Sequence, residues 1–190
     1  MKKIIAVIGD GKIEKDGLKY NLAFETGKAL IDAGYRVQSG GLGGIMEAVF
    51  QGAKSSEKYQ DGDTIAIIPS FDRTEANHYA DIIIPTGMDV MRNGMVVSAD
   101  GVIAIGGGSG TLSEMALAWS LFRLVIAYCN VDGWSSELAG RKLDSRERYQ
   151  SIDDKIYGVE TPQQAIEILD KYVDVYTRYH HGIKYRGIKL

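Results

Sequence analysis

Short runs of apolar residues alternate along the chain with segments in which apolar residues recur at helical spacing. The continuous runs, typical of parallel strands buried on both faces, are residues 3–9, 35–39, 64–69, 80–85, 101–106 and 123–129. Helical spacing marks residues 22–33 and 45–53, and Thr161 and Pro162 supply an N-cap and a first-turn proline for a last helix. The pattern predicts an α/β, Rossmann-like fold: a doubly wound parallel sheet of about six or seven strands with helices on both faces.

Composition narrows the class of protein further. The 190 residues are 45% hydrophobic and 25% charged, as expected for one globular domain spanning residues 1–190. A net charge of −3 argues against a nucleic-acid binder, and the longest apolar runs are too short for a membrane span. The apolar start at residues 3–9 has no cleavage-site pattern, so we expect a first strand and a cytoplasmic protein without membrane partners.

Metal and disulfide chemistry find little support in the sequence. The single cysteine, Cys129, follows an apolar run and is expected to be a buried, inert thiol. No cluster of residues has metal-ligand spacing, since His180 and His181 are adjacent in a basic terminal segment that reads as a solvated or partner-docked tail. We therefore expect neither a metal nor a bound cofactor.

Two glycine clusters follow predicted strands and precede predicted helices. The first comprises Gly40, Gly41, Gly43 and Gly44, and the second comprises Gly107, Gly108, Ser109, Gly110 and Thr111. The carboxyl ends of parallel strands meet at one edge of a sheet, which is where such folds bind ligands. Glycine lets a ligand approach the backbone, and a helix N-terminus favours an anion. Both clusters are therefore candidate phosphate-binding loops, the alternative being tight turns without a ligand.

Neither cluster matches a standard nucleotide motif. The Gly-Lys-Ser/Thr ending of a P-loop is absent. The G-x-G-x-x-G spacing of dinucleotide-binding folds fails at Met46 in the first cluster and at Thr111 in the second. A dinucleotide dehydrogenase is disfavoured.

Glu114 and Arg92 are the candidate reactive side chains. Thr111 and Glu114 have the spacing of a capping box, in which the glutamate would serve only its own helix start. Arg92 follows Met88 by four residues, and with Met91 and Met95 these positions predict a helix with an apolar stripe. The aliphatic part of the Arg92 side chain could cover that stripe, or the side chain could point toward the crevice beside the second glycine cluster.

The segments SGGLGGIMEAV and MRNGMVVSADGVIAIGGGSGTLSEMALA resemble the Lonely-guy family, often labelled "possible lysine decarboxylase". The segments IPTGMDVMRNGMVV and GWSSELAGRKLDSR are closer to a side branch similar to molybdenum-cofactor carriers. The resemblance implies a Rossmann-like fold, a homodimer or higher homo-oligomer, and phosphate binding at Gly107, Gly108, Gly110 and Thr111.

In the cytokinin-activating members the resemblance also implies hydrolysis of the N-glycosidic bond of a nucleoside 5′-monophosphate. The catalytic arginine and glutamate of that reaction map to Arg92 and Glu114. Two positions depart from the motif: its proline is Gly106 here, and the lysine after the arginine is Asn93. Both departures put hydrolysis in doubt more than binding. Lysine decarboxylation is discounted, because nothing suggests a Schiff-base lysine for pyridoxal phosphate.

The sequence therefore supports a protein that binds a small phosphorylated ligand at a glycine-rich loop. The first hypothesis is that the protein is a phosphoribohydrolase acting on a nucleoside 5′-monophosphate. The alternative is a non-catalytic carrier or sensor of a phosphorylated cofactor such as the molybdopterin cofactor.

Overall fold

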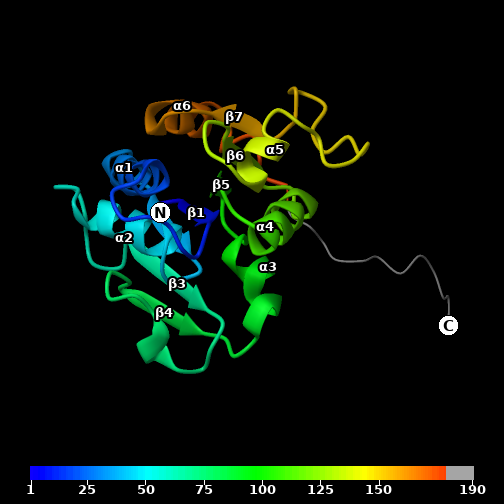
Figure 1. Cartoon of the computed structure of the whole chain (residues 1–190). Coiled ribbons are helices and arrows are strands. Elements are labelled where there is room, and N and C mark those ends of the chain that lie inside the picture. Colours follow the sequence, from blue (N-terminus) through cyan, green and yellow to red (C-terminus); the bar gives the residue numbers. More distant parts are fainter. Residues whose placement is uncertain (179–190) are drawn as a thin grey trace, which may run out of the picture.

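The computed structural model describes residues 1–178 of the chain (Figure 1). The basic segment predicted to be a tail lies, from residue 179 onward, outside the described residues. Within the described part, seven strands form one parallel sheet in the order β4-β3-β2-β1-β5-β6-β7. The strands are β1 (Ile4–Gly9), β2 (Arg36–Ser39), β3 (Thr64–Ile68), β4 (Ile82–Pro85), β5 (Gly101–Ile105), β6 (Leu124–Tyr128) and β7 (Tyr157–Val159). The predicted doubly wound α/β fold is confirmed.

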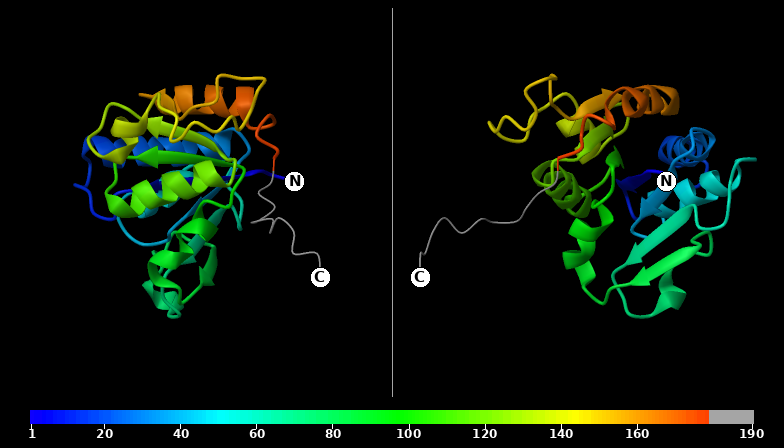
Figure 2. Two further views of the ribbon diagram at one scale, coloured as in Figure 1. Left: turned by 90° about the vertical axis from the view of Figure 1, so that its right-hand side faces the viewer. Right: turned by 180° about the vertical axis from the view of Figure 1, so that it is seen from behind.

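Helices connect the strands and cover both faces of the sheet. They are α1 (Leu18–Asp32), α2 (Ile45–Lys54), α3 (Asn93–Val96), α4 (Ser109–Ser120), α5 (Trp134–Leu138) and α6 (Pro162–Tyr172), with 3-10 turns η1 (Arg73–Glu75) and η2 (Asp89–Arg92). In Figure 2, α1 and α6 lie on the opposite face of the sheet from α4.

The central strands β1, β5 and β6 contribute alternate side chains to two separate cores. Ile5 and Val7 of β1 pack with apolar residues of α1, α2 and α6. Ala6 and Ile8 pack on the other face with residues of α3 and α4, among them Trp119, which is 1% exposed. This alternation explains why the strands read as continuous apolar runs: a residue on either side of the sheet is buried.

Helices α1 and α2 approach each other so closely that only glycine fits at the contact. A Cβ atom at Gly52 would lie 1.8 Å from the carbonyl oxygen of Phe24, and one at Gly27 would lie 2.0 Å from that of Val49. Real Cβ atoms do not come so near a backbone oxygen. The contact fixes both helices and so the loops that lead into them at the carboxyl edge of the sheet.

That edge contains the topological switch point of the fold. Strand β1 has β2 on one side and β5 on the other, and the chain leaves the two neighbours in opposite directions across the sheet. Loops that follow β1 and β5 therefore diverge and leave a crevice, which is where open α/β sheets bind ligands.

Two local expectations were wrong, and one of the two alternatives for Arg92 is excluded. Cys129 is exposed: it directly follows Tyr128, the last residue of β6, although its backbone N–H still donates to the carbonyl of Val159 in β7. The helix expected across residues 88–95 is instead the 3-10 turn η2 followed by one turn of α3. The methionines of that segment are exposed, whereas Arg92 is only 8% exposed and does not lie over them on the surface.

Candidate functional site

A cavity of about 410 Å³ lies at the carboxyl edge beside the start of α4. Loops that follow β1, β2, β3 and β5 all contribute to its wall, together with η2 and α3. Of the predicted site residues, the wall contains Arg92, Gly108, Ser109, Gly110, Thr111 and Glu114. The fold thus brings the two candidate reactive side chains and most of the second glycine cluster into one cavity.

The second glycine cluster turns the chain sharply from β5 into α4. Gly106 and Gly107 have φ values of +63° and +98°, which side chains rarely adopt. Gly108 is the N-cap, and no side chain caps the helix. The backbone N–H groups of Ser109, Gly110 and Thr111 therefore have no partner within α4. With the helix dipole they form a cradle in which an anion such as phosphate would be stabilised.

The first glycine cluster lies behind the cavity and does not contribute to its wall. A Cβ atom at Gly44, whose φ is +67°, would lie 2.2 Å from the carbonyl oxygen of Asp10. One at Gly40 would lie 2.7 Å from Nη2 of Arg92. Gly41 has a φ of +75° and packs on Ala66. The structure thus gives this cluster a role in positioning its neighbours, and ligand contact by Gly40, Gly41, Gly43 and Gly44 stays a prediction.

Arg92 and Glu114 form a buried ion pair in the cavity wall. Nη1 of Arg92 donates to Oε1 of Glu114 across 3.3 Å, and both side chains are about nine-tenths buried. The capping-box alternative for Glu114 is wrong, because α4 begins at Ser109, two residues before the proposed cap Thr111, and the glutamate side chain faces Arg92 instead.

Burial dominates the electrostatics of this pair. It raises the pKa of Glu114 to about 7, although the guanidinium of Arg92 opposes that rise. Burial also lowers the pKa of Arg92, against the attraction of Glu114. Nε of Arg92 is buried without a hydrogen-bond partner, so the guanidinium has unused donor capacity. A carboxyl group that titrates near neutral pH can both accept and donate a proton.

Asn93, which replaces the lysine of the Lonely-guy motif, connects Arg92 to α4. Its Oδ1 accepts from Nη1 of Arg92 at 2.8 Å, and its Nδ2 donates to Oγ of Ser113 at 2.7 Å. Ser113 in turn donates to the carbonyl of Gly110 in the cradle. Asparagine in place of lysine removes a positive charge, but the Asn93 side chain holds Arg92 in place through this hydrogen bond.

Asp10 and Lys19 are further functional candidates, which no sequence motif marks. Oδ2 of Asp10 accepts from the N–H of Gly107 at 3.0 Å and from Nζ of Lys19 at 2.7 Å. A Cβ atom at Gly106 would lie 2.4 Å from the same oxygen and 2.9 Å from Nζ of Lys19. The Asp10–Lys19 pair and the positive φ together exclude proline at position 106. Asp10 directly follows β1, and no motif around it marks a ligand site.

Residues 1–178 contain neither a candidate metal site nor a candidate membrane-spanning helix. No group of three or more histidine, cysteine, aspartate or glutamate side chains there could hold a metal ion. No helix in the same range has both the length and the apolar character needed to cross a membrane.

The fold is that of a Rossmann-like protein: a parallel sheet in which a glycine-rich turn at the switch point leads into an uncapped helix. Together with the sequence motifs, it places the protein in the Lonely-guy type. The chain belongs to the SLOG cluster4 family, whose model matches residues 2–166.

Solved structures and a curated relative agree with this assignment. The molybdenum cofactor binding protein from Rippkaea orientalis is 33% identical with a TM-score of 0.74, and the match covers 90% of this chain and 97% of that one. The molybdenum cofactor carrier protein from Chlamydomonas reinhardtii is 24% identical with a TM-score of 0.71 over 92% and 99% of the two chains, which shows a shared fold. An uncharacterised protein of Archaeoglobus fulgidus is 41% identical over 115 residues, 60% of this chain and 72% of that one.

Proposed function

We propose that this protein binds a phosphorylated pterin-type cofactor, such as the molybdenum cofactor, and carries it without changing it chemically. The observation that carries the proposal is the uncapped N-terminus of α4, whose free N–H groups face a cavity of about 410 Å³. The likeness to the Rippkaea protein, over nearly the whole of both chains, supports a pterin as the ligand class.

The cavity suits a phosphate on physical grounds. Its volume lies within the range of about 300–1,000 Å³ that is usual for small-ligand sites. Each hydrogen bond from a cradle N–H to a charged phosphate oxygen contributes roughly 1.5–3 kcal/mol. Among the described residues that form the wall, Arg92 is the only basic one, and its Nε lacks a partner. Binding would therefore depend more on the backbone cradle than on side-chain charge.

A substitution at Gly110 tests the cradle. A Cβ atom at Gly110 would meet nothing within 4 Å, and its φ is not positive, so a side chain is tolerated there. Gly110→Asp would place a carboxylate beside the bound phosphate, whereas Gly110→Asn is its matched uncharged control. We expect Gly110→Asp to weaken inorganic phosphate binding in calorimetry, and retention of the molybdenum cofactor in gel filtration, at least tenfold more than Gly110→Asn does. Equal retention by the two variants would refute the proposal.

Hydrolysis of a nucleoside 5′-monophosphate is a second candidate function, favoured by the pKa of about 7 at Glu114. In that reaction the C1′–N bond breaks with its electron pair leaving on the base, and water adds to the ribosyl carbon. The ionised glutamate would stabilise the positive ribosyl centre and accept the water's proton.

Calorimetric titration with AMP, followed by chromatography of the mixture, separates the two functions. Release of adenine that Glu114→Ala abolishes would establish hydrolysis. Binding of AMP without release would support a carrier, and an absence of AMP binding would direct the search to pterins alone.

A further inference from the structure

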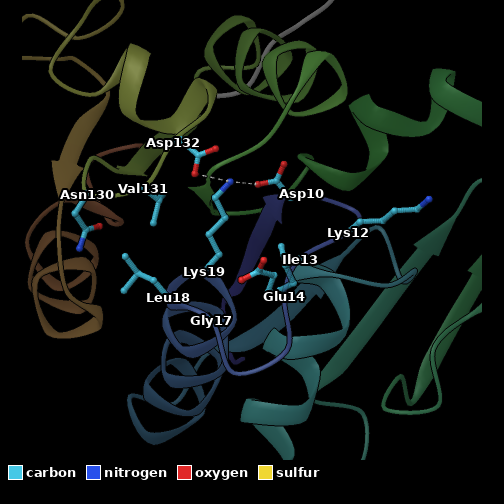
Figure 3. Close-up of a pocket in the computed structure, with 10 residues that line it drawn as sticks. All are labelled: Asp10, Lys12, Ile13, Glu14, Gly17, Leu18, Lys19, Asn130, Val131 and Asp132. Carbon is cyan, nitrogen blue, oxygen red and sulfur yellow. Dashed lines mark hydrogen bonds and ion pairs between the residues drawn. The ribbon is translucent and has the colours of Figure 1, made fainter.

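A second cavity, of about 440 Å³, lies next to the first at the same edge of the sheet (Figure 3). Its wall is formed by the loop between β1 and α1, the start of α1, and the loop after β6. Asp10 belongs to the walls of both cavities. The same carboxylate accepts the N–H of Gly107, two residues before Ser109, the first residue of the cradle. The two cavities therefore meet at a single side chain beside the phosphate cradle.

The polar groups of the second cavity come from three separate elements. Lys19 of α1 stands between Asp10 and Asp132, with its Nζ 2.7 Å from Oδ2 of the first and 3.1 Å from Oδ1 of the second (Figure 3). Asn130 adds a side-chain amide, and Leu18 and Val131 add apolar surface. A flat ring with hydrogen-bonding groups along one edge matches such a wall.

We propose that this second cavity holds the heterocycle of the ligand whose phosphate lies in the cradle, and that the ring carries a 2-amino-4-oxo edge. The proposal rests on the proposed function, which places the phosphate beside Gly107. A 2-amino-4-oxo edge presents two adjacent N–H donors next to one carbonyl acceptor. A carboxylate accepts both donors at once, and an ammonium group beside it donates to the carbonyl. Asp132 and Lys19 supply this pair within 3.1 Å of each other.

The exposure of Asp132 makes the exchange of partners feasible. Its side chain is 94% exposed, so the carboxylate can turn from Lys19 toward a ring without losing packing. Lys19 would keep Asp10 as its partner and so retain charge compensation. An adenine ring fits less well, because its amino group lies beside ring acceptors and it has no second adjacent N–H donor.

Fluorescence titration with unsubstituted pterin tests the second cavity without a phosphate. Lumazine, in which a carbonyl replaces the 2-amino group of pterin, is the matched control ligand. Asp132→Asn is the test variant, and Asp153→Asn is its matched control, because Asp153 is also exposed and also pairs with a lysine, Lys155. We expect the wild-type protein to bind pterin at least tenfold more tightly than lumazine. Asp132→Asn should reduce that preference at least fivefold, and Asp153→Asn should leave it unchanged.

Two outcomes would overturn the inference: equal binding of pterin and lumazine, or an Asp132→Asn variant that behaves as wild type. Inorganic phosphate, titrated into the wild type and Gly110→Asp, reports on the cradle separately. Phosphate binding without pterin discrimination would overturn this inference and leave the proposed phosphate site standing. Pterin discrimination through Asp132 without phosphate binding would support the second cavity and refute the cradle.

Discussion

Replacing Glu114 with glutamine is expected to remove a large part of the pH dependence of this protein's stability. The side chain is 7% exposed and its pKa rises from 4.5 to about 7 because burial disfavours the charged form. The folded state therefore binds a proton more tightly than the unfolded state does. Glutamine has nearly the same shape but does not titrate, so comparing the two proteins isolates this one group.

The size of the effect follows from the two pKa values. Because the folded pKa is the higher one, the carboxyl group stabilises the fold fully below pH 4.5, and that contribution is lost as the pH rises through about 7. At about 1.4 kcal/mol per pKa unit, the contribution falls by roughly 2–3 kcal/mol between about pH 5 and pH 8. Wild type should lose that much free energy of unfolding relative to Glu114→Gln over this interval.

Urea denaturation at several pH values between these limits measures the difference. The buffers should be free of phosphate, because any ligand that binds the folded state raises its stability. Glu167→Gln is a suitable control, because Glu167 is exposed on α6 and its replacement should give no comparable pH-dependent difference. A wild-type-minus-variant difference that stays constant within about 0.5 kcal/mol would refute the assignment of a buried, near-neutral carboxyl group.

Two further substitutions test other features of the fold. Gly106→Ala places a side chain at a φ of +63° against the carboxylate of Asp10, and we expect a loss of about 2–4 kcal/mol in thermal unfolding. Gly94→Ala is the control, since a Cβ there meets nothing, and an unchanged melting temperature for Gly106→Ala would contradict the strain argument. Arg148 donates two hydrogen bonds to the buried carboxylate of Asp154. Arg148→Met leaves that carboxylate without its bidentate partner and should lower the free energy of unfolding in urea by about 3–5 kcal/mol. The exposed Arg146→Met should cost less than about 1 kcal/mol, and equal losses for the two would refute the role of burial.

The strands could be predicted because burial on both faces leaves a direct mark on the sequence. Residues 101–105 are apolar or glycine throughout and all are buried. Strand β7 is only three residues long, and its middle residue is exposed. Such a short segment has no continuous apolar run, so its sequence cannot be told from that of a loop. Cys129 shows the same limit, because a run of apolar residues does not reveal where the strand within it stops.

The residues of the candidate site could be proposed from the sequence, but their geometry could not. Gly108 through Thr111 lie in a local motif, so a single stretch of sequence identifies the cradle. The pairing of Arg92 with Glu114 joins positions 22 apart, and that of Asp10 with Gly107 joins positions 97 apart. Contacts of this kind depend on the order of strands in the sheet, which spacing along the chain does not encode.

The two departures from the Lonely-guy motif take on a different meaning in three dimensions. In the sequence, Gly106 stands where the motif has a proline, and Asn93 stands where it has a positively charged lysine. In the fold, Gly106 makes room for the Asp10–Lys19 pair, and Asn93 holds Arg92 against the helix that forms the cradle. The lysine charge thus disappears from the reacting side of the cavity, while a different lysine stands at the wall it shares with the second cavity. On the proposed function, this arrangement keeps the free N–H groups of α4 available and places further polar groups beside them for the rest of a ligand, which supports the carrier proposal over hydrolysis.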